Sequence, residues 1–239
     1  MAEVSAETDV FRSGADGRTL VLYTATRRHG TRGARARALA DVAMETFRGW
    51  SGMGWQTSVA AMFGDADVPT VYETGFAHDF DIGGVFEAPS VGDAYRGIGQ
   101  LQAGGWDELF ATEWLVGPRE FQPVPSTAGR TPDAGWILFA LWQWNDGWQA
   151  ATAQERAEYD EECDVAFAAD IASGVSIAGR HRMDAQSTWH HLGIWEAPTF
   201  DHVARGMLMH EKVADFAFTT SRHFIGRRRA AADYFGGIR

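Results

Sequence analysis

The sequence has very little cysteine and no long apolar run, and these absences exclude several classes of protein. Only one of the 239 residues is cysteine, Cys163, so the chain forms no internal disulfide and no cysteine-rich zinc site. No apolar run approaches the roughly 20 residues that a membrane-spanning helix needs. The first 17 residues lack the apolar core of a signal peptide. We therefore expect a cytoplasmic protein that makes no use of a membrane.

Basic residues are also scarce. The chain has 21 Lys+Arg against 32 Asp+Glu, which gives a formal net charge of −11. Because phosphates repel a chain of this charge, we do not expect a nucleic acid as partner. Aromatic residues, in contrast, are plentiful, with ten tryptophans in the chain. Most of them are expected in the core, but their flat apolar faces would also suit a planar aromatic ligand.

An internal repeat organises the chain. Residues 81–119 align with residues 190–228 at a constant offset of 109 and without a gap. The clearest correspondence is FEAPS at 86–90 against WEAPT at 195–199. This unbroken alignment indicates a duplicated unit of roughly 110 residues.

Each repeat predicts the order β-α-β-β-α-β, which is typical of a ferredoxin-like unit. In the first repeat we expect strands at 19–27, 68–78, 80–87 and 108–116, with a helical region at 35–63 that is interrupted near residues 52–54 and a helix at 91–103.

The second repeat follows the same order. Its expected strands are 136–145, 175–183, 189–196 and 216–225, and its expected helices are 152–173 and a segment that Pro198 opens.

The predicted fold class is α+β, with two tandem ferredoxin-like units whose antiparallel sheets pack as an α+β barrel. The predicted organisation is a disordered N-terminal tail at 1–17, a first unit at 18–121, a linker at 122–134, a second unit at 135–228 and a C-terminal tail at 229–239.

The βαββαβ order, the EAP[ST] junctions at 87–90 and 196–199, and the closing segment TSRHFIGR at 220–227 resemble the dimeric α+β barrel superfamily in a duplicated, single-chain form. That superfamily includes antibiotic-biosynthesis monooxygenases, muconolactone-isomerase-like enzymes and haem proteins such as chlorite dismutase. The chain length, duplication and tryptophan content look most like the cofactor-independent oxygenases of aromatic polyketide pathways. These include anthrone oxygenases and the ring-opening oxygenases of angucycline and anthraquinone-fused enediyne pathways.

The resemblance implies a monooxygenase or dioxygenase that uses O2 on a polycyclic aromatic polyketide in antibiotic biosynthesis. It implies no cofactor, and a flavin reductase acting upstream where the substrate must be reduced. In such a reaction a positioned base deprotonates the substrate, the carbanion passes an electron to dioxygen, and the resulting peroxide collapses.

The repeat identifies candidate site residues, because a position that is apolar in one copy and polar in the other has left a purely structural role. His210 aligns with Leu101 and lies on the apolar face of the last helix, so it is our first choice as the base. His191, which shares strand parity with Trp189 and Trp195, is the second.

Other side chains complete the predicted site. Asn145 or Arg222 would hold the substrate oxyanion. Six of the eight histidines fall in the second repeat, so we expect the site there. The predicted substrate-binding residues are Trp142, Trp144, Trp189, His181 and His223.

Other functions stay open. In a haem enzyme of the same fold, His210 or His191 would be the axial ligand, and in a non-haem iron enzyme the ligands would be His181, His191 and His210, or two of them with Glu196. No metal-binding motif such as H-E-x-x-H demands either. A non-catalytic binding protein for an aromatic metabolite would need the tryptophans but no base. A homodimer also stays open.

Overall fold

The computed structural model describes residues 16–130, 134–212 and 215–238. Residues 1–15 of the predicted N-terminal tail and residues 131–133 of the predicted linker lie outside this range. The chain divides into two compact units. The N-unit comprises residues 17–118 and 225–239, and the C-unit comprises residues 119–224 together with Asp16.

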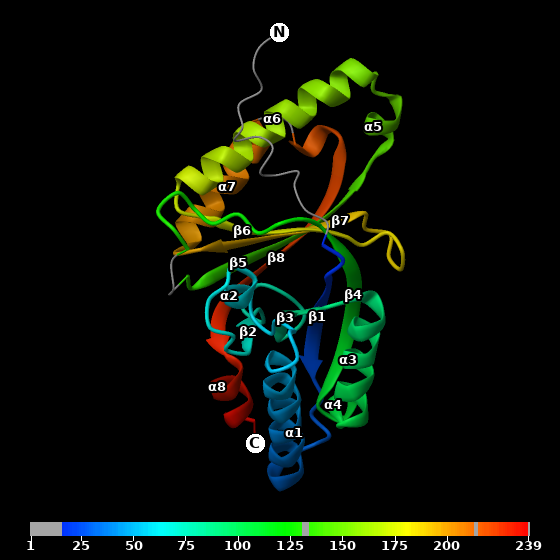
Figure 1. Ribbon diagram of the computed structural model, residues 1–239, viewed down its shortest axis with the longest axis vertical. Helices are drawn as coiled ribbons and strands as arrows, with labels where there is room; N and C mark the ends of the chain where they lie inside the picture. Colours follow the sequence, from blue (N-terminus) through cyan, green and yellow to red (C-terminus); the bar gives the residue numbers. More distant parts are fainter. Residues whose placement is uncertain (1–15, 131–133, 213–214, 239) are drawn as a thin grey trace. The chain divides into compact units, whose positions relative to one another are not determined.

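The predicted βαββαβ order is confirmed in the N-unit (Figure 1). Two elements match their predicted bounds to the residue because each has a clear period and a clear end: β1 and α3. The elements of the N-unit are β1 (Thr19–Arg27), α1 (Gly33–Ser51), α2 (Val59–Met62), β2 (Thr70–Glu73), β3 (Ile82–Ala88), α3 (Val91–Ala103), α4 (Trp106–Leu109), β4 (Phe110–Phe121) and α8 (Ala231–Gly236).

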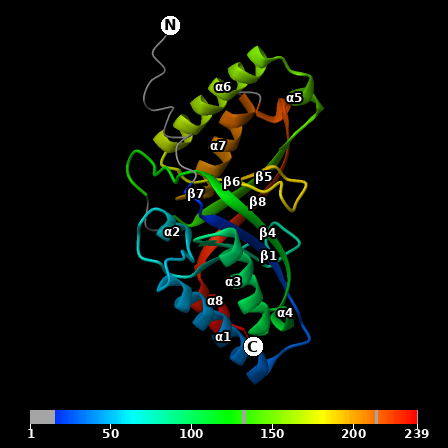
Figure 2. The same cartoon turned by 45° about the vertical axis from the view of Figure 1, so that its right-hand side comes forward.

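The C-unit repeats this order, and Figures 1 and 2 show α6 and α7 side by side over its strands. Its elements are β5 (Trp136–Trp144), α5 (Asp146–Ala150), α6 (Ala153–Ala172), β6 (Ser176–Arg182), β7 (His191–Ala197), α7 (Phe200–Lys212), the 3-10 turn η2 (Asp215–Ala217) and β8 (Thr219–Ala230).

The strands pair in antiparallel fashion, and the predicted fold class is confirmed. The order is β4-β1-β3-β2-β8 in the N-unit and β8-β5-β7-β6-β4 in the C-unit. Strands β4 and β8 each have residues in both units.

Several segments differ from their expected structure. Short helical turns replace the first residues of the strands expected at 108–116 and 216–225. The strand expected at 68–78 ends at Glu73, because Thr74 closes a turn by donating its Oγ1 hydrogen to the carbonyl of Phe80 at 2.8 Å. The C-terminal residues, expected as a tail, continue β8 and then form α8. They do so because Arg227 to Ala230 pair with β2. The two segments lie some 150 positions apart, so no local sequence pattern predicts this pairing.

The doubled EAP[ST] motif has the same structural role in both units. Glu87 is fully buried and pairs with Arg18 at 3.2 Å, and Glu196 is 1% exposed and pairs with Arg130 at 2.7 Å. A buried carboxylate needs such a partner, because burial without one is costly. Ser90 then caps α3 by accepting the backbone N–H of Asp93.

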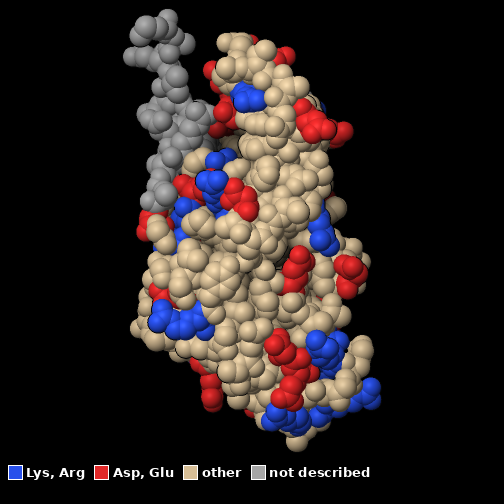
Figure 3. Space-filling model, turned by 90° about the vertical axis from the view of Figure 1, so that its right-hand side faces the viewer, with Lys and Arg blue, Asp and Glu red and all other residues tan. Residues whose placement is uncertain are grey.

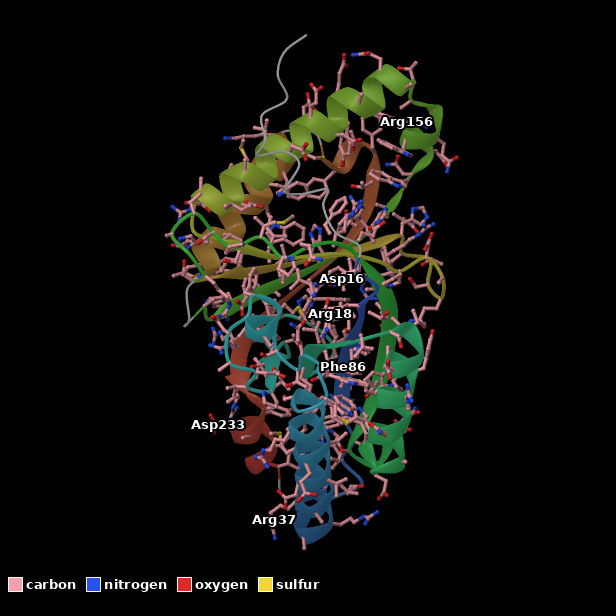
Figure 4. The ribbon with its side chains drawn as sticks, in the orientation of Figure 1. Asp16, Arg18, Arg37, Phe86, Arg156 and Asp233 are labelled. Carbon is pink, nitrogen blue, oxygen red and sulfur yellow. The ribbon has the colours of Figure 1, made fainter. Side chains whose placement is uncertain are left out.

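Aromatic side chains fill the space between helices and sheet in the N-unit. Trp50 stacks on Trp55 at 4.7 Å between ring centroids, and Phe86, labelled in Figure 4, is fully buried against both. The ring of Tyr23 covers Gly84 so closely that a Cβ there would come within 2.2 Å of its hydroxyl. The N-unit therefore has a solid aromatic core.

The surface carries charges of both signs. On the face in Figure 3, small groups of basic side chains lie next to acidic ones. Among the described residues, no helix combines the length and apolar character that crossing a membrane requires.

Candidate functional site

The C-unit holds a cavity of about 440 Å³ between its sheet and helices α6 and α7. This volume is ordinary for a small-molecule site. Alternate residues of β5, namely Leu138, Ala140, Trp142 and Trp144, form one wall, because successive strand residues point to opposite faces. Helix α6 provides much of the opposite wall.

The strand register explains why this space is open in one unit and filled in the other. In the N-unit Tyr23 lies opposite Gly84, and in the C-unit Ala140 lies opposite Gly193, the repeat partner of Gly84. Ala140 thus occupies the position of Tyr23 but contributes only a methyl group. Position 140 therefore has no ring equivalent to that of Tyr23, and Gly193 is covered by the ring of Trp195 instead.

Indole rings give the cavity an aromatic wall. Trp144 and Trp148 stack at 4.1 Å with an interplanar angle of 14°, and Tyr159 packs edge-on against both. Arg156, labelled in Figure 4, lies with its guanidinium carbon 5.1 Å from the centroid of the Trp148 ring. Flat faces of this kind favour a planar aromatic ligand.

Arg180 and His191 line the sheet wall of the cavity, and both contact the carboxylate of Glu120, which is not itself a lining residue. We call these three residues the acid–base cluster. His191 Nδ1 lies 2.9 Å from Glu120 Oε2, and Arg180 Nε donates to the same oxygen at 2.8 Å. Burial acts to raise the pKa of Glu120, but the hydrogen bond from His191 and the charge of Arg180 outweigh it, so the pKa lies below its ordinary value.

An ionised Glu120 fixes the tautomer of His191. A carboxylate only accepts hydrogen bonds, so Nδ1 carries the proton and donates it. In the neutral ring Nε2 then has the lone pair, and His191 lines the cavity beside Trp142, 5.3 Å away between ring centroids. A carboxylate that orients an imidazole in this way is a common arrangement for a general base.

Two β-bulges bring the acid–base cluster together. Between the pairs Arg119↔His181 and Phe121↔Arg180, β4 advances two residues while β6 advances one, so Glu120 is the extra residue. A second shift, between Ile177 and Arg180, adds one residue to β6 against β7. The described pairs of β2, the counterpart of β6, run without a shift. Bulges re-aim side chains in this way beside active sites.

His210, the first-choice base, belongs to a different group. Its Nε2 lies 3.0 Å from Asp170 Oδ2, which also accepts the indole N–H of Trp195 at 3.0 Å. Its Nδ1 exposes less than 1 Å². His210 is 6% exposed and borders the cavity, but in this arrangement its ring nitrogens face Asp170 and the protein interior. The geometry therefore favours His191 over His210 as the base.

Gly206 permits the contact between α6 and α7. A Cβ at this position would lie 2.7 Å from Asp170 Oδ1, and the carboxylate is held by His210 and Trp195. We expect Gly206→Ala to lower the free energy of unfolding by about 1–3 kcal/mol, the usual cost of overpacking. Urea unfolding would measure it.

The matched control is Gly99→Ala. Gly99 is also inside a helix, but nothing lies within 4 Å of the place that a Cβ would take there, so helix propensity alone should stabilise this variant by up to about 1 kcal/mol. Equal stabilisation by the two substitutions would show that Asp170 gives way easily.

Four predicted site residues line the cavity besides His210: Trp142, Trp144, His191 and His223. Asn145 caps α5 instead, accepting the N–H of Trp148 at 3.2 Å and donating to the carbonyl of Ala217 at 3.1 Å.

The other predicted residues lie outside the lining. Arg222 is exposed, with its guanidinium over Phe224 at 4.6 Å. His181 is fully buried on β6, and Trp189 precedes β7.

Sequence reasoning missed Glu120, Arg180 and Asp170. One signal was available for Arg180: at the repeat offset of 109 it aligns with Val71, a fully buried apolar residue. Glu120 gave no such signal, because its orientation depends on a bulge in long-range pairing.

The cavity does not fit a haem group. A haem carries two carboxylates, which proteins usually bind with cationic side chains. The charged lining residues are three aspartates and a single arginine: Asp160, Asp164, Asp170 and Arg180. The lining is therefore acidic where a haem would need positive charge.

The proposed iron ligands are not brought together either. Among the residues that the structure describes, no three His, Cys, Asp or Glu side chains are placed to hold a metal ion. Glu196, the carboxylate of one alternative set, is bound to Arg130.

Comparison with known proteins supports the fold. No family model and no curated protein matches the chain. A tryptophan-to-valine mutant of chlorite dismutase from Candidatus Nitrospira defluvii has a TM-score of 0.74 at 10% identity, covering 97% of this chain and 98% of that chain. The imidazole complex of chlorite dismutase from the same organism has a TM-score of 0.74 at 11% identity, covering 93% and 95%. Similarity at this low identity shows a chlorite-dismutase-like fold and no more, so the dimeric α+β barrel superfamily and the narrower likeness to antibiotic-biosynthesis monooxygenases stay predictions.

Proposed function

We propose that the chain is a cofactor-independent oxygenase that uses O2 on a polycyclic aromatic compound of the polyketide type, with His191 as the general base. The observation that carries the proposal is His191 in the wall of an aromatic cavity, paired through Nδ1 with the carboxylate of Glu120, which does not itself line the cavity. The acidic lining, which does not suit a haem, supports chemistry without that group.

The reaction needs from the protein a general base and a group that stabilises the protonated base. His191 Nε2 takes a proton from an anthrone, phenol or hydroquinone, and Glu120 stabilises the imidazolium that forms. The electron-rich anion passes one electron to dioxygen, and the two radicals combine to a peroxide. The peroxide anion takes the proton back from His191, and for an anthrone the resulting hydroperoxide collapses to a carbonyl and water, so that one oxygen atom enters the product and the other leaves as water.

The tryptophans would hold the ring system flat and keep water from the reactive peroxide. Trp142 lies directly opposite His191 across the β5–β7 ladder, which would place a ring stacked on its indole within reach of the imidazole. The stacked pair of Trp144 and Trp148 would extend the same wall.

Two measurements on the purified protein test the proposal. We expect an absorption spectrum without a Soret band, no stoichiometric iron, and oxygen uptake with members of a panel of anthrones and reduced anthraquinones. A Soret band or bound iron would overturn the cofactor-independent mechanism. Tight binding of the whole panel without oxygen uptake would instead identify a binding protein.

A further inference from the structure

The charged side chains are distributed unevenly around the cavity, with acidic residues on one wall and a basic residue on the other. Its acidic lining residues, Asp160, Asp164 and Asp170, all belong to α6, whereas its arginine, Arg180, comes from β6 in the sheet wall. An anionic group of a ligand is therefore favoured at the sheet and disfavoured at the helix.

At the sheet wall, Arg180 and His191 share one carboxylate oxygen of Glu120. Arg180 also stacks on Phe121, with its guanidinium carbon 3.9 Å from the ring centroid, which holds the guanidinium plane in place. A proton acceptor and a cation thus meet at a single point of the cavity wall.

We propose that the acid–base cluster binds hydroxylated aromatic ligands as their phenolates, with Arg180 as the residue that stabilises the oxyanion. This inference rests on the proposed function and narrows its substrates to hydroxyarenes. The phenol O–H bond breaks, the proton forms a bond to His191 Nε2, and the electron pair stays on oxygen. Nothing is oxidised in this step.

The charges balance before and after proton transfer. Before it, Glu120 and Arg180 form an ion pair beside a neutral imidazole. After it, the imidazolium faces Glu120 and the phenolate faces Arg180, so each new charge has an opposite charge next to it. A base without the arginine would leave the phenolate beside a cavity lined by aspartates. Arg180 is thus what makes ionisation favourable inside an acidic cavity.

The probe is 1,2-dihydroxyanthraquinone, whose visible absorption moves to longer wavelength when its phenol ionises. We expect the bound dye to ionise at a pH about one to three units lower than the free dye, the usual effect of a cation within a few ångströms. Arg180→Gln should remove most of this shift, and Arg180→Lys should keep part of it. Arg182→Gln is the matched control, because Arg182 lies on the same strand and pairs with the exposed Asp184.

Unsubstituted anthraquinone separates the two proposals. We expect it to quench tryptophan fluorescence equally in the wild type and in Arg180→Gln, which also shows that the variant is folded. The inference about Arg180 fails, and the aromatic site stands, if anthraquinone binds but the bound dye ionises at the same pH as the free dye. It also fails if the bound dye ionises at the same pH in the wild type and in Arg180→Gln. If neither compound binds the wild type, the proposed function itself fails.

Discussion

His191→Ala is expected to lower kcat/KM for oxygen uptake by roughly 10²- to 10⁴-fold, the usual contribution of a general base. The substrate should still bind within a few-fold of its wild-type affinity, because the indole wall is unchanged. The measurement is oxygen consumption by the purified variant, paired with quenching of tryptophan fluorescence by the same compound. Exogenous imidazole should restore part of the rate.

The control is His29→Ala, which removes an exposed histidine from the N-unit and should leave the rate unchanged. Glu120→Gln should give an intermediate loss, since the amide holds the ring but no longer stabilises the imidazolium. A rate loss in His210→Ala that exceeds the loss in His191→Ala would contradict our choice of base. Unchanged turnover in both variants would exclude base catalysis by either histidine.

The features that can be predicted from sequence are those that local patterns encode. Helix α3 runs from Val91 to Ala103 as expected, because Ser90 caps its start and an apolar stripe marks its length. Strand parity predicts that His191 and Trp195 face the same side, and both line the cavity. The duplication places the predicted site in the second repeat, and the cavity described here is also lined by residues of the C-unit.

The features that sequence reasoning misses depend on contacts between distant segments. Glu120 faces His191 only because a bulge against β6 re-aims it, and no local period reports a bulge. The sequence around Asp170 indicates an ordinary amphipathic helix, yet this residue is 3% exposed and joins His210 to Trp195. The pattern correctly shows His210 as a polar residue on an apolar face, but the carboxylate that explains it lies 40 positions earlier.

Ala140→Tyr is expected to abolish ligand binding while leaving the protein folded. The substitution restores the residue that closes the N-unit, where Tyr23 lies opposite Gly84. In the C-unit the ring of Trp195 already covers Gly193, since a Cβ there would lie 2.3 Å from that ring. A tyrosine ring at position 140 must therefore extend into the cavity, where it would displace a planar ligand.

We expect the dissociation constant for anthraquinone to rise at least about 100-fold, a loss of about 2.7 kcal/mol of binding free energy. The free energy of unfolding should change little or rise, because the new ring fills empty volume and overpacks nothing. Ala140→Ser, which adds a single oxygen atom, is the control and should bind within a few-fold of wild type. If Ala140→Tyr bound the ligand normally, the aromatic compound would have to occupy another site. If Ala140→Tyr unfolded the C-unit, the space beside Ala140 would be too small for a tyrosine ring and therefore too small for an aromatic ligand. Because the change places the residue of the first repeat in the second, this experiment also tests whether the size of the side chain at position 140 decides if the cavity is open.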